Sequence, residues 1–294
     1  MKDALGDVVE VAVQEQSLYP GDHIRFYTDS GDLVYRKILN ATLIERDVSQ
    51  IQNLVKKHYP NLQHVRLFQH IISLQLDSVV KVSEGNLLAN LDRNGRGFVL
   101  RNNQVKIGRA RGFLIKASDG IIEGNHISHL ALPGILLAGE ANYVIESDAV
   151  SNVVIRNNTI ESVNEGHLSP YRQVQGGALV ILFSGKDIIG HRNIRVEDNR
   201  FINIPGVNIQ VNNASNIWVN RNVFIGSHHR ESVAGQNAGV DNSALIWMDR
   251  VNGVTFGEGR DANFYQEIGE FANKAALVRY TENTRNVRGE IYPK

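Results

Sequence analysis

The segment VSNVVIRNNTI, Val150–Ile160, contains the pattern that decides the fold. Val153 and Ile155 alternate with polar residues, as in a β-strand that buries one face. The alternation stops at Asn157-Asn158, and buried amides cost stability unless they are hydrogen-bonded. The fold must therefore supply hydrogen-bond partners for this asparagine pair.

The same pattern recurs along the chain. Copies that end a short apolar strand on an asparagine are GFVLRNNQV, GIIEGNHI, NVVIRNNTI, NIRVEDNRF and NIWVNRNVF. A weaker sixth copy, NGVTFGEG, has Gly257 near the asparagine position. The equivalent asparagines are Asn103, Asn125, Asn158, Asn199 and Asn222. They are 22, 33, 41 and 23 residues apart, so the shorter steps set the period and the longer steps contain insertions.

Each copy is followed by a second apolar strand that starts at or near a small residue, as in GFLIKAS and GILLAGE. Short strands in a repeat of 22 residues, without helical periodicity, favour a parallel β-solenoid. The sequence therefore predicts an all-β fold whose equivalent positions stack from coil to coil. An asparagine at the same inward corner of every coil can bond the asparagines above and below it. We therefore interpret the five asparagines as a structural ladder and not as catalytic groups.

The first 95 residues follow a different pattern. Residues 23–39 alternate on both sides of a Ser-Gly pair, which indicates a β-hairpin. Residues 47–59 have apolar residues at helical spacing, with Asp47 or Ser49 as N-cap. Solenoids need caps, because an open coil end exposes unpaired strand edges. We divide the chain into a small α+β insertion or cap, residues 1–95, and β-helix coils with an irregular C-terminal cap, residues 96–294.

Composition excludes several classes of function. Lys plus Arg equals Asp plus Glu, 31 each, so bulk charge indicates no nucleic-acid partner. The absence of cysteine excludes disulfides, Cys-ligated zinc and thiol catalysis. The longest apolar run, Ala178–Phe183, is too short to span a bilayer, and the first residues contain no signal-peptide pattern. We expect no membrane partner, no metal and no other cofactor.

Long insertions flank the GILLA-type strand, so its outward face is predicted to form a ligand trough. Val180 is expected to point inwards. The outward columns are predicted to be Lys116, Ala138, Ile181, Gln210 and Trp247, and beside them Ser118, Glu140, Phe183, Asn212 and Asp249. Such a floor suits a carbohydrate, because aromatic faces stack on sugar CH groups and polar groups bind hydroxyls. The alternative is a solvated sheet of mixed residues. An exposed Trp247 could be removed with little loss of thermal stability.

Candidate acids and bases lie in the rim loops. A glycoside hydrolase uses two carboxylates, and the candidate pair is Glu140 with Glu146 or Asp148. Most loop carboxylates are simply solvated, which is the competing interpretation. Further rim residues are Glu165, His167, His228, His229 and Glu231. Two adjacent histidines on a polar loop could bind a metal, but this pattern is not specific.

Three motifs also point to a known family: PGD at residues 20–22, RARG at residues 109–112, and Glu146 shortly before NVVIRNN. Over Leu18–Phe224 the sequence resembles the right-handed β-helix α-galactosidases of glycoside hydrolase family 110. The resemblance implies a right-handed, single-stranded parallel β-helix. It also implies an inverting exo-hydrolase that removes terminal α-linked galactose without a metal. An extracellular or periplasmic location is implied as well, although the chain shows no signal peptide.

The sequence departs from this family at the catalytic coils. The resemblance places the catalytic carboxylates upstream of the PGD segment, in coils that contain an Asp-Asp pair. This sequence has no Asp-Asp pair, and only 19 residues precede Pro20, so we expect those coils to be absent. Arg109, Arg111 and Glu146 could shape a subsite wall, or the arginines could form a salt bridge with Glu146. The expected substrate-binding residues are Arg109, Arg111, Lys116, Gln210, Trp247 and Asp249.

Three functions remain open from the sequence. The first is a carbohydrate-active β-helix protein related to α-galactosidase-type hydrolases, with little or no hydrolase activity of its own. The second is a polysaccharide lyase or depolymerase, in which Arg109 and Lys116 would act on a uronate. The third is a non-catalytic carbohydrate-binding or structural solenoid. The expected partner is an oligo- or polysaccharide, and copies could associate through the N-terminal edge of the solenoid.

Overall fold

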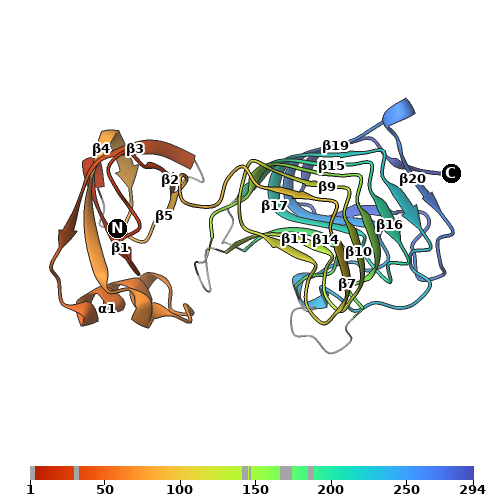
Figure 1. Ribbon diagram of the computed structural model, residues 1–294, viewed down its shortest axis with the longest axis horizontal. Coiled ribbons are helices and arrows are strands. Elements are labelled where there is room, and N and C mark those ends of the chain that lie inside the picture. Colours follow the sequence, from red (N-terminus) through yellow and green to blue (C-terminus); the bar gives the residue numbers. More distant parts are fainter. Residues whose placement is uncertain (1–3, 30–32, 141–144, 146, 166–173, 185–188) are drawn as a thin grey trace. The chain divides into compact units, whose positions relative to one another are not determined.

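The computed structural model describes residues 4–29, 33–140, 145, 147–165, 174–184 and 189–294. The chain divides into two compact units, which are drawn in Figure 1. The first unit contains residues 1–96, 140–148 and 184–188. The second unit contains residues 97–139, 149–183 and 189–294.

The first unit is a five-stranded antiparallel sheet with one α-helix. Its strand order is β1-β4-β3-β2-β5, so β1 and β5 lie at opposite ends of the sheet. Its elements are β1 (Ala4–Val13), β2 (His23–Tyr27), β3 (Leu33–Ile44), α1 (Val48–His58), the 3₁₀ turn η1 (Val65–Leu67), β4 (His70–Val82) and β5 (Leu87–Asn90). Ile24, Phe26, Ile38, Leu74 and Leu76 form the centre of its core and are fully buried.

The hairpin and the helix predicted in this unit are confirmed. Strands β2 and β3 pair antiparallel. Helix α1 begins after Asp47, whose carboxylate accepts hydrogen bonds from the backbone N–H groups of Ser49 and Gln50 at 2.8 and 3.2 Å. These bonds satisfy donors that a helix N-terminus leaves unpaired, while Ile51 and Val55 are buried in the core. That this unit caps the solenoid stays a prediction.

The second unit consists of stacked coils, and every ladder described between its strands is parallel. Figure 1 shows the strands of successive coils lying side by side. The seven-stranded sheet consists of β7 (Gln104–Gly108), β10 (His126–Leu130), β13 (Thr159–Val163), β16 (Arg200–Ile202), β18 (Val223–Ile225), β20 (Asn263–Gln266) and β23 (Ile291–Pro293). The predicted parallel β-solenoid is therefore confirmed.

An eleven-stranded sheet completes each coil of the second unit. Its strands are β6 (Val99–Arg101), β8 (Phe113–Ile115), β9 (Gly120–Glu123), β11 (Ile135–Glu140), β12 (Ser151–Arg156), β14 (Leu179–Ser184), β15 (His191–Glu197), β17 (Ile209–Asn220), β19 (Ile246–Phe256), β21 (Val278–Tyr280) and β22 (Arg285–Arg288). Among the described residues, its loops contain the 3₁₀ turns η3 (Gln236–Ala238) and η4 (Gly259–Asp261). The interior is apolar and includes Phe201 and Phe224, whose rings stack with centroids 5.2 Å apart. Burial of these faces is the main stabilising contribution.

The predicted asparagine ladder is confirmed at the inner corner of the coils. In each rung except the last, the backbone N–H and the Nδ2 donate to the Oδ1 of the asparagine in the next coil at 2.9–3.0 Å. From Asn125 onward, the Nδ2 of each rung also donates to a backbone carbonyl, as that of Asn158 does to Ile122 at 2.9 Å. The rungs are Asn103, Asn125, Asn158, Asn199, Asn222 and Asn263. Stacking therefore provides the partners that the buried amides require.

The sixth rung is Asn263, and the assignment of this position to Gly257 was wrong. Turn η4 is inserted between β19 and the corner, which moves the asparagine further along the chain. Gly257 packs against the inserted turn, because a Cβ at that position would lie 2.0 Å from the Asp261 carbonyl oxygen. The sixth rung was predicted at the wrong residue because the insertion lies inside the repeated motif and changes its spacing.

The residue before a rung has its own role. Asn102, Gly124, Asn157, Asp198 and Arg221 have φ angles between 54° and 65°. This left-handed conformation turns the chain, and Gly, Asn and Asp adopt it at the least cost. In the asparagine pair of the deciding motif, the first residue therefore makes the turn and the second is the buried rung.

A second ladder runs along an exposed corner, and the sequence reasoning missed it. The Nδ2 groups of Asn152, Asn193 and Asn216 donate to the Oδ1 of the preceding coil at 2.8, 3.0 and 3.2 Å, beginning at Asp119. These four residues also have positive φ angles, from 54° to 57°. The signal was present in the sequence, because an asparagine precedes the apolar strand in SNVVI, RNIRV and SNIWV.

Candidate functional site

The outward face of β14, β17 and β19, expected as an open trough floor, is covered. Gln210 lies opposite Val180 on one side and opposite Trp247 on the other, so Val180 points outwards with them. Ile181 instead belongs to the interior, and the predicted phase of β14 was wrong by one residue. The run ALVILF is apolar on both faces because both faces are buried. Its sequence therefore does not show which side chains point into the coil and which point outwards.

The Gln210 side chain holds a loop segment against this face through hydrogen bonds. Its Oε1 accepts a hydrogen bond from the Gly176 N–H at 2.5 Å, and its Nε2 donates to the Val174 carbonyl at 3.0 Å and to Asn212 Oδ1 at 2.7 Å. The side chain is 0% exposed. The expectation that Gln210 is open to a ligand was wrong, because loop residues 174–176 occupy its polar atoms.

Trp247 is 4% exposed and forms a small apolar cluster with Val207, Val240 and Ala244. Val240 and Ala244 belong to the segment that precedes β19, so this segment lies against the indole ring. The expectation of an exposed Trp247 was therefore wrong. The insertion folds over the strand, which covers the floor that it was expected to rim.

Asp249 lies in the neighbouring column and is 8% exposed. Its Oδ1 accepts from Thr281 Oγ1 at 2.6 Å, and its Oδ2 lies 3.0 Å from an Arg250 guanidinium nitrogen. Arg250 Nε donates in turn to Asn213 Oδ1 at 2.7 Å. Both carboxylate oxygens are thus engaged by protein groups from this coil and the next.

The basic residues of the expected substrate set lie near the first coils. Arg109 is exposed, whereas Arg111 and Lys116 are partly buried. Arg111 Nε donates to Gln175 Oε1 at 3.0 Å. Glu146, the expected partner of the arginines, lies outside the described residues. A role of these side chains in substrate binding stays a prediction.

The candidate catalytic acids have different surroundings. Glu140 ends β11, is partly buried, and donates its backbone N–H to the Ser147 carbonyl at 3.3 Å. Asp148 forms a salt bridge with Arg25, and the two side chains are 5% and 3% exposed. The Tyr27 hydroxyl also donates to Asp148. A buried carboxylate held by an arginine and a tyrosine is typical of a structural ion pair within the first unit. Catalysis by Glu140 with Glu146 or Asp148 stays a prediction.

The predicted rim residues serve mainly as loop contacts. Glu165 forms a salt bridge with Arg230, and His229 donates to a backbone carbonyl at 2.7 Å. His228 is fully buried, while His167 lies outside the described residues. In the part of the chain that the structure describes, no three His, Asp or Glu side chains gather as a metal site would require.

An accessible aromatic surface lies on the other half of the eleven-stranded sheet. Arg195, Trp218 and Thr255 are aligned in successive coils, and Trp218 is only partly buried. The Arg195 guanidinium carbon lies 5.2 Å from the centre of the Trp218 ring, a cation–π distance. We call Arg195, Trp218 and Thr255 the Trp218 strip. The sequence indicated it, because NIRV and NIWV place both side chains between the same two inward residues.

Charged and polar groups flank the Trp218 strip. Glu197 Oε1 lies 3.2 Å from Arg195 Nη1, and its Oε2 lies 3.6 Å from Arg221 Nη2. The Arg195 side chain remains 52% exposed. An exposed guanidinium and a carboxylate beside an aromatic ring provide donors, acceptors and an apolar face for one polar ligand.

Comparison with known proteins assigns the family. The family described as right handed beta helix region matches residues 73–224, more than half of the chain. The chain belongs to the right-handed β-helix family. The predicted fold class, including its handedness, is thereby confirmed for this β-helix protein.

Two curated relatives of this β-helix protein are α-1,3-galactosidases B. The protein from Akkermansia muciniphila is 30% identical over 196 residues, which are 65% of this chain and 22% of the relative. The protein from Bacteroides thetaiotaomicron is 31% identical over 134 residues, which are 45% of this chain and 22% of the relative. These matches confirm the resemblance to α-galactosidases, but the chain spans less than a quarter of the relatives' length.

A solved structure from Parabacteroides merdae, provisionally described as a glycosyl hydrolase, is also similar to this β-helix protein. It has a TM-score of 0.30 and 12% sequence identity, covering 65% of this chain and 81% of the other. Among the described residues, no helix combines the length and the apolar character needed to cross a membrane.

The buried His228 is expected to make this β-helix less stable in acid. Burial lowers its pKa from 6.5 to about 4, although hydrogen bonding to the Ala244 carbonyl and the nearby Asp241 oppose the shift. The unfolded chain therefore binds more protons than the folded chain between these two values. Stability should fall as the pH is lowered through this range, by about 3 kcal/mol in total.

Urea unfolding at several pH values between 7 and 4, monitored by circular dichroism, measures this dependence. His228→Asn should reduce the slope, and asparagine tolerates the φ angle of 63° at this position. His229→Asn removes the exposed neighbouring imidazole and is the matched control, whose slope should stay closer to that of the wild type than the slope of His228→Asn. An unchanged slope in His228→Asn would contradict the assignment.

Proposed function

We propose that the chain is a carbohydrate-active β-helix protein related to α-galactosidase-type glycoside hydrolases. The observation that carries the proposal is the 30% identity over 196 residues to α-1,3-galactosidase B of A. muciniphila. The proposed ligand is an oligosaccharide that ends in α-1,3-linked galactose. An extracellular or periplasmic location forms part of the same proposal.

The Trp218 strip is the proposed binding surface. A sugar ring can stack its CH groups on the accessible part of the indole, while Arg195 and Glu197 bind its hydroxyls. This surface is preferred to the predicted trough, because Gln210 and Trp247 are buried under loop residues. The salt bridge between Arg195 and Glu197 balances their charges, which suits a neutral ligand.

Titration with a galactosyl-α-1,3-galactose oligosaccharide by isothermal calorimetry tests the binding. The wild-type protein should bind, and Trp218→Ala should weaken the affinity at least about tenfold, since stacking on an aromatic ring is worth about 1.4 kcal/mol or more. Tyr280→Ala is the matched control, because Tyr280 is also aromatic and is 53% exposed outside the strip. The proposal fails if the wild type does not bind, or if Trp218→Ala binds equally well.

Hydrolysis is measured in a separate assay, because a protein can bind an oligosaccharide without cleaving it. We expect little or no turnover of a panel of aryl α- and β-glycosides. Asp148 is held in the buried ion pair with Arg25, which leaves it poorly placed to act on a substrate. Robust turnover of the aryl α-galactoside would show that the chain is itself a hydrolase.

A further inference from the structure

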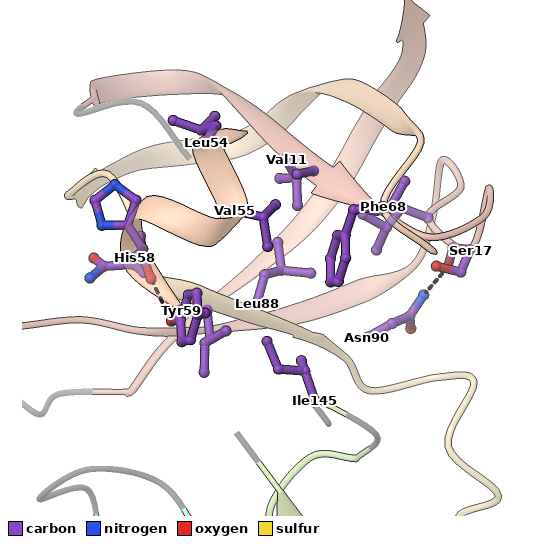
Figure 2. A pocket seen from close by; sticks show the side chains of 16 residues that line it. Val11, Ser17, Leu54, Val55, His58, Tyr59, Phe68, Leu88, Asn90 and Ile145 are labelled. Atoms are coloured by element: carbon purple, nitrogen blue, oxygen red, sulfur yellow. Dashed lines mark hydrogen bonds between the residues drawn. The ribbon is translucent and has the colours of Figure 1, made fainter. Parts of the chain in front are cut away.

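The first unit contains an apolar pocket that no part of the proposed function uses. Its volume is about 170 Å³, and Figure 2 shows the side chains that line it. The walls come from β1, α1 and β5, together with Phe68 and Ile145. Strands β1 and β5 are the two ends of the sheet, so the sheet curls until its ends face each other across the pocket. The interior of an incompletely closed barrel is a common position for ligand sites.

Most of the wall consists of hydrocarbon. Val11 on β1, Val55 on α1 and Leu88 on β5 line the pocket from different elements, and the Phe68 ring forms another part of the wall (Figure 2). Ile145 contributes a further aliphatic side chain. An apolar wall of this kind holds water poorly and favours an apolar occupant.

Three polar side chains of the wall, those of Tyr59, Asn90 and His58, are already engaged by the protein. Tyr59 Oη donates to the Gly85 carbonyl at 2.7 Å, and Asn90 Nδ2 donates to the Ser17 carbonyl at 2.9 Å, as drawn in Figure 2. His58 Nε2 lies 2.7 Å from a Glu84 carboxylate oxygen. A charged or strongly polar occupant would lose its hydration without gaining these groups as partners. The occupant is therefore an uncharged apolar group.

The volume limits the size of that group. An apolar protein cavity of about 150 Å³ stays dry and binds benzene. A pocket of about 170 Å³ therefore accommodates one six-membered ring or a group of similar size. We propose that this pocket is a binding site for a single uncharged aromatic ring. The ring can belong to a free small molecule or to an aromatic side chain of a peptide, since both present the same surface.

Binding of two probes to the full-length chain tests this proposal. Benzene and N-acetyl-phenylalaninamide are titrated separately, with the melting temperature and the NMR shifts of the pocket methyl groups as readouts. Saturable binding of benzene alone indicates a site for small molecules, and tighter binding of the amide indicates a site for a peptide side chain. Both results support the proposal, whereas no saturable binding of either probe overturns it.

Variants that fill the pocket make the test specific. Val55→Phe and Leu54→Trp should fold with an unchanged circular dichroism spectrum and lose at least about tenfold in affinity for the probe. Two positions are used because the buried Val55 site could resist the larger ring, whereas Leu54 is only partly buried. Val48→Phe is the matched control, since Val48 lies on the same helix, is 42% exposed and is not part of the pocket wall. Equal binding by the folded filled variants overturns the proposal.

The pocket and the Trp218 strip belong to different units, so failure of one proposal leaves the other standing.

Discussion

Asn199→Ala is expected to lower the free energy of unfolding by about 4 kcal/mol, because it leaves several buried groups without partners. Asn199 Oδ1 accepts from the backbone N–H and the Nδ2 of Asn158 at 3.0 and 2.9 Å. Its Nδ2 donates to the Ile155 carbonyl at 2.9 Å and to Asn222 Oδ1 at 3.0 Å. The corner is closed to solvent, so water does not replace the lost amide. Urea unfolding followed by circular dichroism measures the loss.

Asn193→Gly is the matched control for the buried rung. Asn193 belongs to the exposed ladder of the same coil, and its φ angle of 54° is one that glycine adopts easily. We expect this variant to lose less than about 1 kcal/mol. Equal losses in the two variants would mean that burial does not decide the contribution of an asparagine in this fold.

Trp247→Ala is expected to cost about 4 kcal/mol, since it removes the largest side chain of a buried apolar cluster. The indole packs against Val207, Val240 and Ala244, and alanine would leave a cavity between β19 and the segment that covers it. The covering segment should also become more accessible. Urea unfolding measures the loss of stability, and limited proteolysis measures the exposure of residues 232–244.

Trp218→Ala is the control for this prediction, because Trp218 is the other tryptophan of the chain and points outwards from the Trp218 strip. Its loss should cost about 1 kcal/mol or less. A larger loss of stability in Trp218→Ala than in Trp247→Ala would contradict the burial of Trp247 and would favour the exposed position that the sequence predicted. The comparison thus separates a buried packing residue from an accessible one.

The coils could be predicted from the sequence because their signal repeats. Asn125, Asn158 and Asn199 occupy the same place in three copies of one motif, and a repeated buried amide requires a stack of equivalent corners. Asn263 was not predicted as a rung of the ladder, because turn η4 lengthens the motif that would have identified it. Prediction was therefore reliable where local pattern and repeat agreed.

The candidate site could not be predicted in the same way. Gln210 and Trp247 alternate correctly for an outward face, but alternation gives only the direction of a side chain. Whether that face is open depends on where a long insertion folds. Residues 225–242 contain no periodic pattern that would predict their packing over strand β19. The accessible aromatic surface was consequently found at Trp218, on the other half of the sheet.

The sequence by itself determined the repeat, the parallel strands and the asparagine ladder, because each is fixed by contacts between equivalent residues in adjacent coils. The different roles of Asn157, which turns the chain, and Asn158, which is buried, were seen only in the structure. Only the tertiary structure decided which outward faces are covered, that Asp148 pairs with Arg25, and that β1 and β5 enclose a pocket. These features join segments that are far apart in the sequence and follow no common period, so only the folded chain brings them together.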